Sequence, residues 1–120
     1  MVPALLLALL ACADAPDPCA RMCARAEALY GACLESWGLG WEAAGYADAD
    51  DFLGRCETWA WEMRLLEEDA VRRGELEEAG AVDAACQERA DRFEQAAADP
   101  ADLDCEAYTG EAWDQVPWAG

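Results

Sequence analysis

The sequence predicts an all-α fold, a small disulfide-stapled bundle of three main helices plus a short C-terminal helix. Three stretches carry apolar residues at steps of four and three, which is the period of one helix face. No stretch shows the alternation of apolar and polar residues that indicates a half-buried strand. Three disulfides would support the modest core of such a chain. They would use the cysteines Cys19, Cys23, Cys33, Cys56, Cys86 and Cys105.

The first helix is predicted from Pro18 to about Ser36. Asp17 suits the N-cap position, and Pro18 suits the first helical position. Two glycines, Gly38 and Gly40, follow the helix and are expected to end it. Its predicted apolar face comprises Cys19, Cys23, Ala26, Tyr30, Cys33 or Leu34, and Trp37.

The second helix is predicted to open at a cluster of acids around Asp48, because carboxylates complement the positive end of the helix dipole. Gly74 and Gly80 are both candidate terminators. The acid runs at 67–69 and 75–78 are expected to form a solvated face. The predicted apolar face comprises Phe52, Cys56, Trp59, Met63, Leu66 and Ala70.

The third helix is predicted to stop at Asp99-Pro100, and the residues from 115 onward are expected to be irregular. Between Asp102 and Trp113 the sequence leaves room for one short helix that carries Cys105. The predicted apolar face of the third helix comprises Val82, Cys86, Ala90, Phe93 and Ala97.

Helix geometry predicts a disulfide pattern. A hairpin that turns about residues 44–45 would bring Cys33 opposite Cys56. The third helix would then run parallel to the first, which places Cys86 near Cys19 and Cys23. The expected pairs are Cys33–Cys56, Cys23–Cys86 and Cys19–Cys105, and in the last two pairs Cys19 and Cys23 could exchange partners.

The N-terminal stretch ends in Leu9-Leu10-Ala11-Cys12 after an uncharged apolar run. A small residue precedes the cysteine, and two large apolar residues precede that one. This pattern resembles the lipobox of bacterial lipoproteins. The resemblance implies cleavage before Cys12 and transfer of a diacylglyceryl group to its thiol. The wider chain is similar in style to small cysteine-rich lipoproteins of GC-rich, myxobacteria-like genomes.

Two other interpretations of this stretch stay open. Cleavage after Ala13 or Ala15 by a general signal peptidase would give a secreted protein. An uncleaved stretch would be the first turns of a buried helix, with Cys12 as a core thiol. The first three residues contain no Lys or Arg, so the signal is atypical or begins further upstream. The cysteine count favours the lipoprotein, because seven is odd and a lipid on Cys12 leaves six for disulfides.

The expected organisation is a signal peptide over 1–11, a lipidated tether over 12–17 and a single cysteine-rich helical domain over 18–120. Disulfides persist in oxidising compartments, so the domain is expected in the cell envelope, on the periplasmic or surface face of the membrane. Acyl chains on Cys12 would attach it to that membrane, more plausibly the outer than the inner one.

Composition excludes several classes of function. The chain has 26 acidic residues against 8 basic ones, all Arg, and a formal charge of −18. Such a surface repels nucleic acid and anionic lipid head groups, so nucleic acid is not an expected partner. The sequence contains no His and therefore offers no imidazole as a general base or zinc ligand. No cofactor and no metal is expected.

Two functional classes remain. The first is a non-enzymatic envelope lipoprotein that presents an acidic module to another envelope protein. The second is a carboxylate-based or divalent-metal-dependent enzyme or enzyme accessory. Asp48 and Asp50 begin like an EF-hand loop, but Phe52 and Trp59 occupy positions that should hold ligands. The only serine, Ser36, has no His to activate it, so the first class is favoured.

Tryptophan is the residue type that marks a candidate binding surface, because it is enriched in binding hot spots. The candidates are Trp41, Trp61, Trp113 and Trp118. Trp61 lies about 200° round the helix from Trp59 and should face away from the core stripe. The alternative is that the loop and tail tryptophans fold back to cover the ends of a thin core.

Overall fold

The computed structural model describes residues 17–115 of this chain, and within that range it is all-helical, with no strand. The predicted all-α class is therefore confirmed. There are three long helices, with one short 3-10 turn between the first two and two more after the third, the last of which carries Cys105 as expected. The elements are α2 (Pro18–Ser36), η1 (Trp41–Ala44), α3 (Ala49–Arg72), α4 (Ala81–Ala97), η2 (Pro100–Asp102) and η3 (Cys105–Tyr108).

Helix α2 begins and ends where its capping residues predict. The carboxylate of Asp17 accepts the backbone N–H groups of Cys19 and Ala20, each at 2.9 Å. This satisfies two of the amides that have no partner inside the helix. At the other end the N–H of Leu39 donates to the carbonyl of Leu34 at 2.8 Å. The first turn and the last turn of α2 are thus both closed locally.

Helix α3 ends at the first of the two candidate glycines. Gly74 has a φ of +76°, and the N–H of Glu75 donates to the carbonyl of Ala70 at 2.9 Å. This left-handed residue and return hydrogen bond are a common way to finish a helix. Gly80, with a φ of +130°, stands instead at the N-cap of α4. At the start of α3 the side chain of Asp48 accepts the N–H of Asp51 at 2.8 Å.

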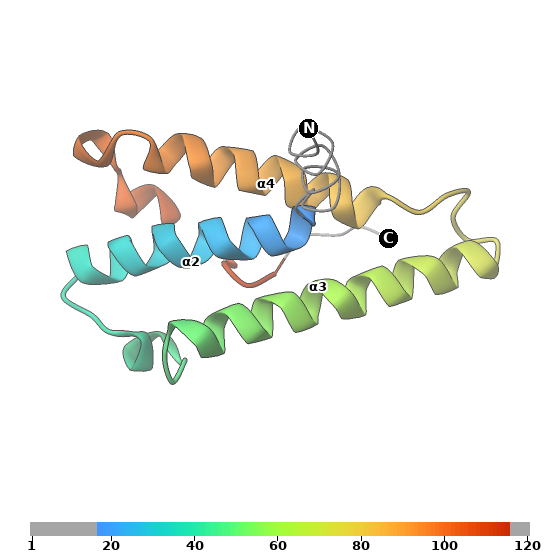
Figure 1. Ribbon diagram of the computed structural model, residues 1–120, viewed down its shortest axis with the longest axis horizontal. Helices are drawn as coiled ribbons and strands as arrows, with labels where there is room; N and C mark the ends of the chain where they lie inside the picture. The colour runs from blue at the N-terminus through green and yellow to red at the C-terminus, as the bar shows by residue number, and fades with distance from the viewer. Residues whose placement is uncertain (1–16, 116–120) are drawn as a thin grey trace, which may run out of the picture.

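Helix α2 lies between the other two helices (Figure 1). Helix α4 runs parallel to α2, as predicted, and Arg21 of α2 contacts Asp91 of α4 at 2.6 Å. Helix α3 runs antiparallel to α2 and continues well past the N-terminal end of α2, where it approaches the start of α4 (Figure 1). The C-terminal half of α3 therefore packs against less of the protein than the N-terminal half.

The buried core combines small residues and thiols with two phenylalanines. Met22 and Leu29 of α2, Phe52 of α3, and Val82 and Phe93 of α4 are its largest fully buried apolar side chains. Around Phe52 and Phe93, aromatic side chains from α2, the first loop and the C-terminal segment pack edge-on, tilted or stacked. These aromatics are Tyr30, Trp41, Tyr46, Tyr108 and Trp113.

The predicted disulfide pairs are wrong. The structure joins Cys19 to Cys86, Cys23 to Cys56 and Cys33 to Cys105. The corresponding Cα separations are 4.8, 5.8 and 5.4 Å, within the usual range for this bond. Cys33–Cys56, Cys23–Cys86 and Cys19–Cys105 do not form. The alternative prediction, in which Cys19 and Cys23 exchange partners, is correct for one bond, that between Cys19 and Cys86.

The error in Cys33–Cys56 arises in the first loop. A symmetric hairpin would start α3 opposite the end of α2, but the loop folds back along α2. Trp41 packs edge-on against Tyr30, with ring centroids 5.4 Å apart. A Cβ added to Gly31 would lie 3.3 Å from Cζ2 of Trp41, so this glycine permits the close approach. Helix α3 consequently starts beside the middle of α2, and Cys56 faces Cys23.

The error in Cys19–Cys105 has a simpler cause. Because α4 runs parallel to α2, its last residues arrive at the C-terminal end of α2, where Cys33 lies (Figure 1). Cys105 follows α4 after only a short turn and bonds to Cys33. Reaching Cys19 would have required the chain to return along the whole of α2.

The predicted apolar face of α3 is correct except at Leu66: Ala70 is buried, and Trp59 and Met63 are partly buried against the core. Phe52 and Cys56 are fully buried, whereas Leu66 is 50 % exposed and Glu67 is only 3 % exposed. Leu66 lies on the outward side of α3 at this point, whereas Glu67 and Ala70 lie on its inward side. Glu67 is turned inward towards the start of α4, which corrects the expectation that residues 67–69 form a solvated face.

Candidate functional site

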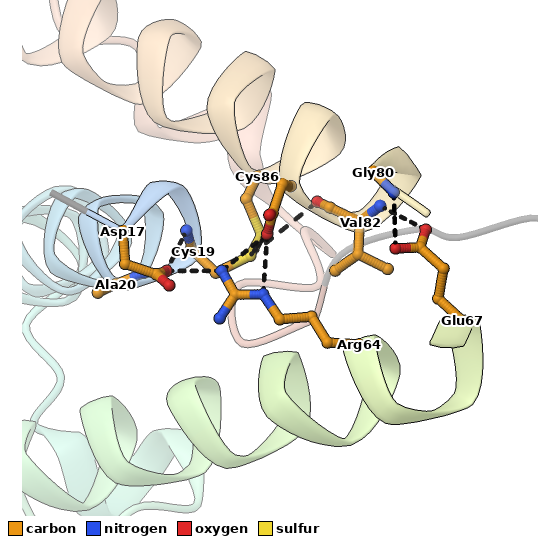
Figure 2. A network of polar contacts seen from close by, with 9 residues as sticks. Asp17, Cys19, Ala20, Arg64, Glu67, Gly80, Val82 and Cys86 are labelled. Carbon is orange, nitrogen blue, oxygen red and sulfur yellow. Dashed lines mark hydrogen bonds and ion pairs between the residues drawn. A yellow bond between two sulfur atoms is a disulfide. The ribbon is translucent and has the colours of Figure 1, made fainter. Parts of the chain in front are cut away.

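The most concentrated polar network of the described residues lies where the N-terminal segment enters the domain. Figure 2 shows Arg64 of α3 between two carboxylates from different parts of the chain. Its guanidinium donates to Asp17 at 2.7 Å and to Asp83 at 2.8 Å. The Cys19–Cys86 disulfide lies beside this group, so one covalent bond and two ion pairs join α2, α3 and α4.

The charges of this junction stabilise one another. The hydrogen bond from Arg64 holds the pKa of Asp17 below its ordinary value, with help from the Cys19 and Ala20 amides, although partial burial opposes the shift. The hydrogen bond to Asp17 in turn raises the pKa of Arg64. Asp17 is therefore ionised at neutral pH and serves both as the cap of α2 and as the partner of Arg64.

Glu67 extends the same network to the start of α4. Its two carboxylate oxygens accept the N–H groups of Gly80 at 2.9 Å and Val82 at 3.0 Å (Figure 2). Gly80 has no side chain to cap α4, so a carboxylate from another helix performs that role. A negative group is favoured there by the positive end of the α4 dipole.

Arg89 lies one turn after Cys86 on α4 and fixes the position of the C-terminal tail. This buried guanidinium donates to Glu111 at 2.9 Å and to the carbonyls of Ala112 and Gln115 at 2.8 and 2.6 Å. Burial lowers its pKa, and its Nε has no hydrogen-bond partner in the described chain. Arg89 thus holds the tail in the position that brings Trp113 onto Tyr30, with the two rings parallel and their centroids 4.7 Å apart.

Sequence reasoning missed Arg64, Glu67 and Arg89. A signal for the two buried residues was nonetheless present. Glu67 lies four residues after Met63 and three before Ala70, and Arg89 lies between Cys86 and Phe93 at helical spacing. A charged residue at a core register of a helix is either buried with partners or marks the end of the packed face.

The four candidate tryptophans do not form one surface. Trp113 is 4 % exposed, and Trp41 is partly buried against the core, so these two cover the bundle as the alternative predicted. Trp61 is 59 % exposed on α3 and remains a candidate. Trp118 lies outside the described residues, as does Cys12, the predicted lipidation site.

Residues 17–115 contain neither a metal-binding cluster nor a membrane-spanning helix. No group of three or more acidic or cysteine side chains in this range is arranged to hold a metal ion. None of the helices in this range combines the length and the apolarity needed to cross a bilayer.

The hollows on the described surface are open and shallow. One, of about 280 Å³, lies at the junction and is lined by Asp17, Ala20, Trp61 and Arg64. Another, of about 400 Å³, lies further along α3 and is lined by Glu62, Met63, Leu65, Leu66 and Asp69. The first adjoins the N-terminal segment, and the second combines apolar side chains with two carboxylates.

Comparisons with known proteins add no further constraint on function. No family model, no curated protein and no solved structure matches this chain.

Proposed function

We propose that this chain is a lipid-anchored, non-enzymatic lipoprotein of the bacterial cell envelope, whose folded domain is an acidic interaction module. The observation that carries the proposal is the use of the cysteines. All six cysteines of residues 17–115 pair with one another, so none of them is left to pair with Cys12. Cys12 stands at the lipobox position, and an acyl chain there gives the seventh thiol a role.

The anchor is tested on the mature protein made in a bacterial host with a lipoprotein pathway. Mass spectrometry of the N-terminal peptide should find a diacylglyceryl-modified Cys12 as the first residue. Cys12→Ser should release the protein from the membrane fraction without changing its far-UV circular dichroism spectrum. An intact Met1, or an unmodified Cys12 in a protein that still sediments with membranes, would contradict the proposal.

For the module, the proposed partner is an envelope protein with a basic surface. The support comes from the hollow on α3, where Leu66 is 50 % exposed and Glu62 and Asp69 stand at the edge. An apolar centre with a charged rim is the usual composition of a specific interface. Charges of opposite sign on the partner would accelerate and orient the encounter.

A photo-cross-linking amino acid at position 66 should capture a partner in the native envelope. The same amino acid at Leu39 is the matched control, because Leu39 is equally exposed, at 49 %, but lies beyond the other end of α2. The product at position 66 should weaken in Glu62→Gln/Asp69→Asn and at raised salt. Equal capture at both positions would reject this surface.

A further inference from the structure

An exposed apolar strip lies on α3 beside the entry point of the N-terminal segment. Trp61 and Leu65 are 59 % and 43 % exposed and stand four residues apart, so they are neighbours on the helix surface. The term lipid-facing strip is used below for these two residues. Leu65 also borders the hollow around Leu66, so the lipid and the proposed protein partner would occupy adjacent parts of the same helix surface. Neither residue belongs to the core, where Ala60 and Cys56 occupy the inward face of the same helix. The fold alone does not account for a tryptophan at this position.

The position of the strip ties it to the anchor. Trp61 lines the hollow of about 280 Å³ together with Asp17, the first described residue, and Ala20 in the first turn of α2. Arg64, one turn from Trp61, holds Asp17 at 2.7 Å. Cys12 precedes Asp17 by five residues, a length that spans at most about 18 Å when fully extended. An acylated Cys12 therefore keeps Trp61 close to the bilayer surface.

We propose that Trp61 and Leu65 insert into the head-group region of the phospholipid bilayer that holds the acylated Cys12. This inference rests on the proposed function, because the anchor is what brings the strip to the membrane. The indole ring favours the membrane–water interface, where its apolar body and its N–H group are both accommodated. The strip thereby fixes which side of the bundle faces the lipid and leaves the loop end at Leu39 pointing away.

The charges around the strip select the kind of lipid. Arg64 pairs with Asp17 and Asp83 at this end of the bundle and offsets one of their two negative charges. Glu57, however, lines the same hollow as Trp61, and Glu62 follows Trp61 in the helix. Anionic head groups would repel the exposed carboxylates beside the strip. The strip is therefore expected to enter a bilayer of zwitterionic lipids.

The same carboxylates argue against a second copy of this chain as the occupant. In a symmetric pair the same patch meets itself, so the strip of one copy would face the strip of the other. Glu57 and Glu62 would then approach the same two residues of the partner copy, in molecules that each carry a charge of −18. A zwitterionic lipid surface imposes no such repulsion.

The experiment uses the mature acylated protein in vesicles of phosphatidylcholine and phosphatidylethanolamine, with or without brominated phosphatidylcholine. Bromine quenches the fluorescence of indoles that lie within the bilayer. Wild type should lose a measurable part of its emission, and Trp61→Phe should abolish at least half of that loss. Trp37→Phe is the matched control, because Trp37 follows the last residue of α2 at the end away from Asp17, and it should leave the quenching unchanged. Leu65→Gln should reduce the quenching while Trp61 is still present.

Vesicle flotation separates the inference from the proposed function. Wild type should float with the vesicles and Cys12→Ser should not, whether or not Trp61 inserts into the bilayer. If Cys12→Ser floats equally well, the proposed anchor fails. If wild type floats but brominated lipid does not quench it, or quenches Trp61→Phe to the same extent, the anchor stands and the lipid-facing strip is refuted. Quenching of Trp61 by aqueous acrylamide alone would likewise refute it and leave a protein as the occupant.

Discussion

At the scale of single residues, Asp17 makes two interactions, the cap of α2 and the ion pair with Arg64. Two substitutions distinguish their contributions to stability. Asp17→Ala removes the cap of α2 and the ion pair with Arg64, whereas Asp17→Asn keeps an oxygen for capping. Losing a cap costs about 0.5–2 kcal/mol, and a half-exposed ion pair contributes at most about 1 kcal/mol. Urea unfolding should therefore rank wild type above Asp17→Asn, and Asp17→Asn above Asp17→Ala. Equal stabilities for the two variants would show that capping contributes nothing.

The same residue predicts a dependence on pH. The hydrogen bond from Arg64 is the main reason why the pKa of Asp17 is lower in the folded state than in the unfolded chain. Near this pKa the folded protein therefore binds fewer protons at Asp17 than the unfolded chain does. Its stabilising contribution is complete above the unfolded pKa of about 4 and is lost as pH falls through the lower folded value. The difference in unfolding free energy between wild type and Asp17→Asn should shrink over that interval, as measured by urea titrations between pH 5 and pH 2. A constant difference would contradict the charge pairing.

The tryptophans give a second prediction at this scale, because identical substitutions meet opposite surroundings. Trp113→Ala removes a buried ring that packs on Tyr30 and Phe93, and we expect a loss of about 3–5 kcal/mol in unfolding free energy. Trp61→Ala removes an exposed ring and should stay within about 0.5 kcal/mol of wild type. Chemical denaturation of the unanchored domain measures both. Comparable losses would mean that Trp61 supports the fold.

At the scale of elements, the start of α4 depends on a side chain from α3. Glu67→Gln replaces a carboxylate that accepts two backbone N–H groups by an amide with a single acceptor oxygen. Leaving a buried donor without a partner costs about 1–3 kcal/mol, and the lost charge also faces the helix dipole. Hydrogen exchange should accelerate in the first turn of α4.

The matched control for this prediction is Glu68→Gln, one residue along and exposed on α3. It makes the same chemical change without touching α4 and should leave hydrogen exchange in that helix as it is in wild type. If both variants accelerated exchange equally, the effect would come from net charge and not from capping.

At the scale of the whole molecule, the disulfide pattern can be determined with one protease. Trypsin places each of the six paired cysteines on its own peptide, because at least one arginine lies between any two of them. The arginines are at positions 21, 25, 55, 64, 72, 73, 89 and 92. Digestion without reduction should release linked peptides that contain Cys19 with Cys86, Cys23 with Cys56, and Cys33 with Cys105. The same peptides should separate after reduction. A peptide that joins Cys33 to Cys56 would restore the symmetric hairpin and contradict the folded-back loop.

The positions of the helices follow from the sequence itself. The predicted start of α2 at Pro18 and the candidate terminator Gly74 agree with the structure, because caps and left-handed glycines act on adjacent backbone groups. The parallel course of α4 and α2 also follows, since two short connections reverse the chain twice. Of the candidate site, the sequence alone indicated Trp61 as outward-facing, from the helical period, and it is exposed.

Only the tertiary structure decides which residues of different helices meet. The loop aromatic Trp41 folds onto Tyr30, and this shift along α2 changes the partner of Cys56 from Cys33 to Cys23. The C-terminal half of α3 turns Leu66 outward and brings Glu67 to the start of α4. Local sequence determines a helix through contacts three or four residues apart. Pairing between helices depends on how far each connection carries the chain, which is set by side chains that meet only after folding.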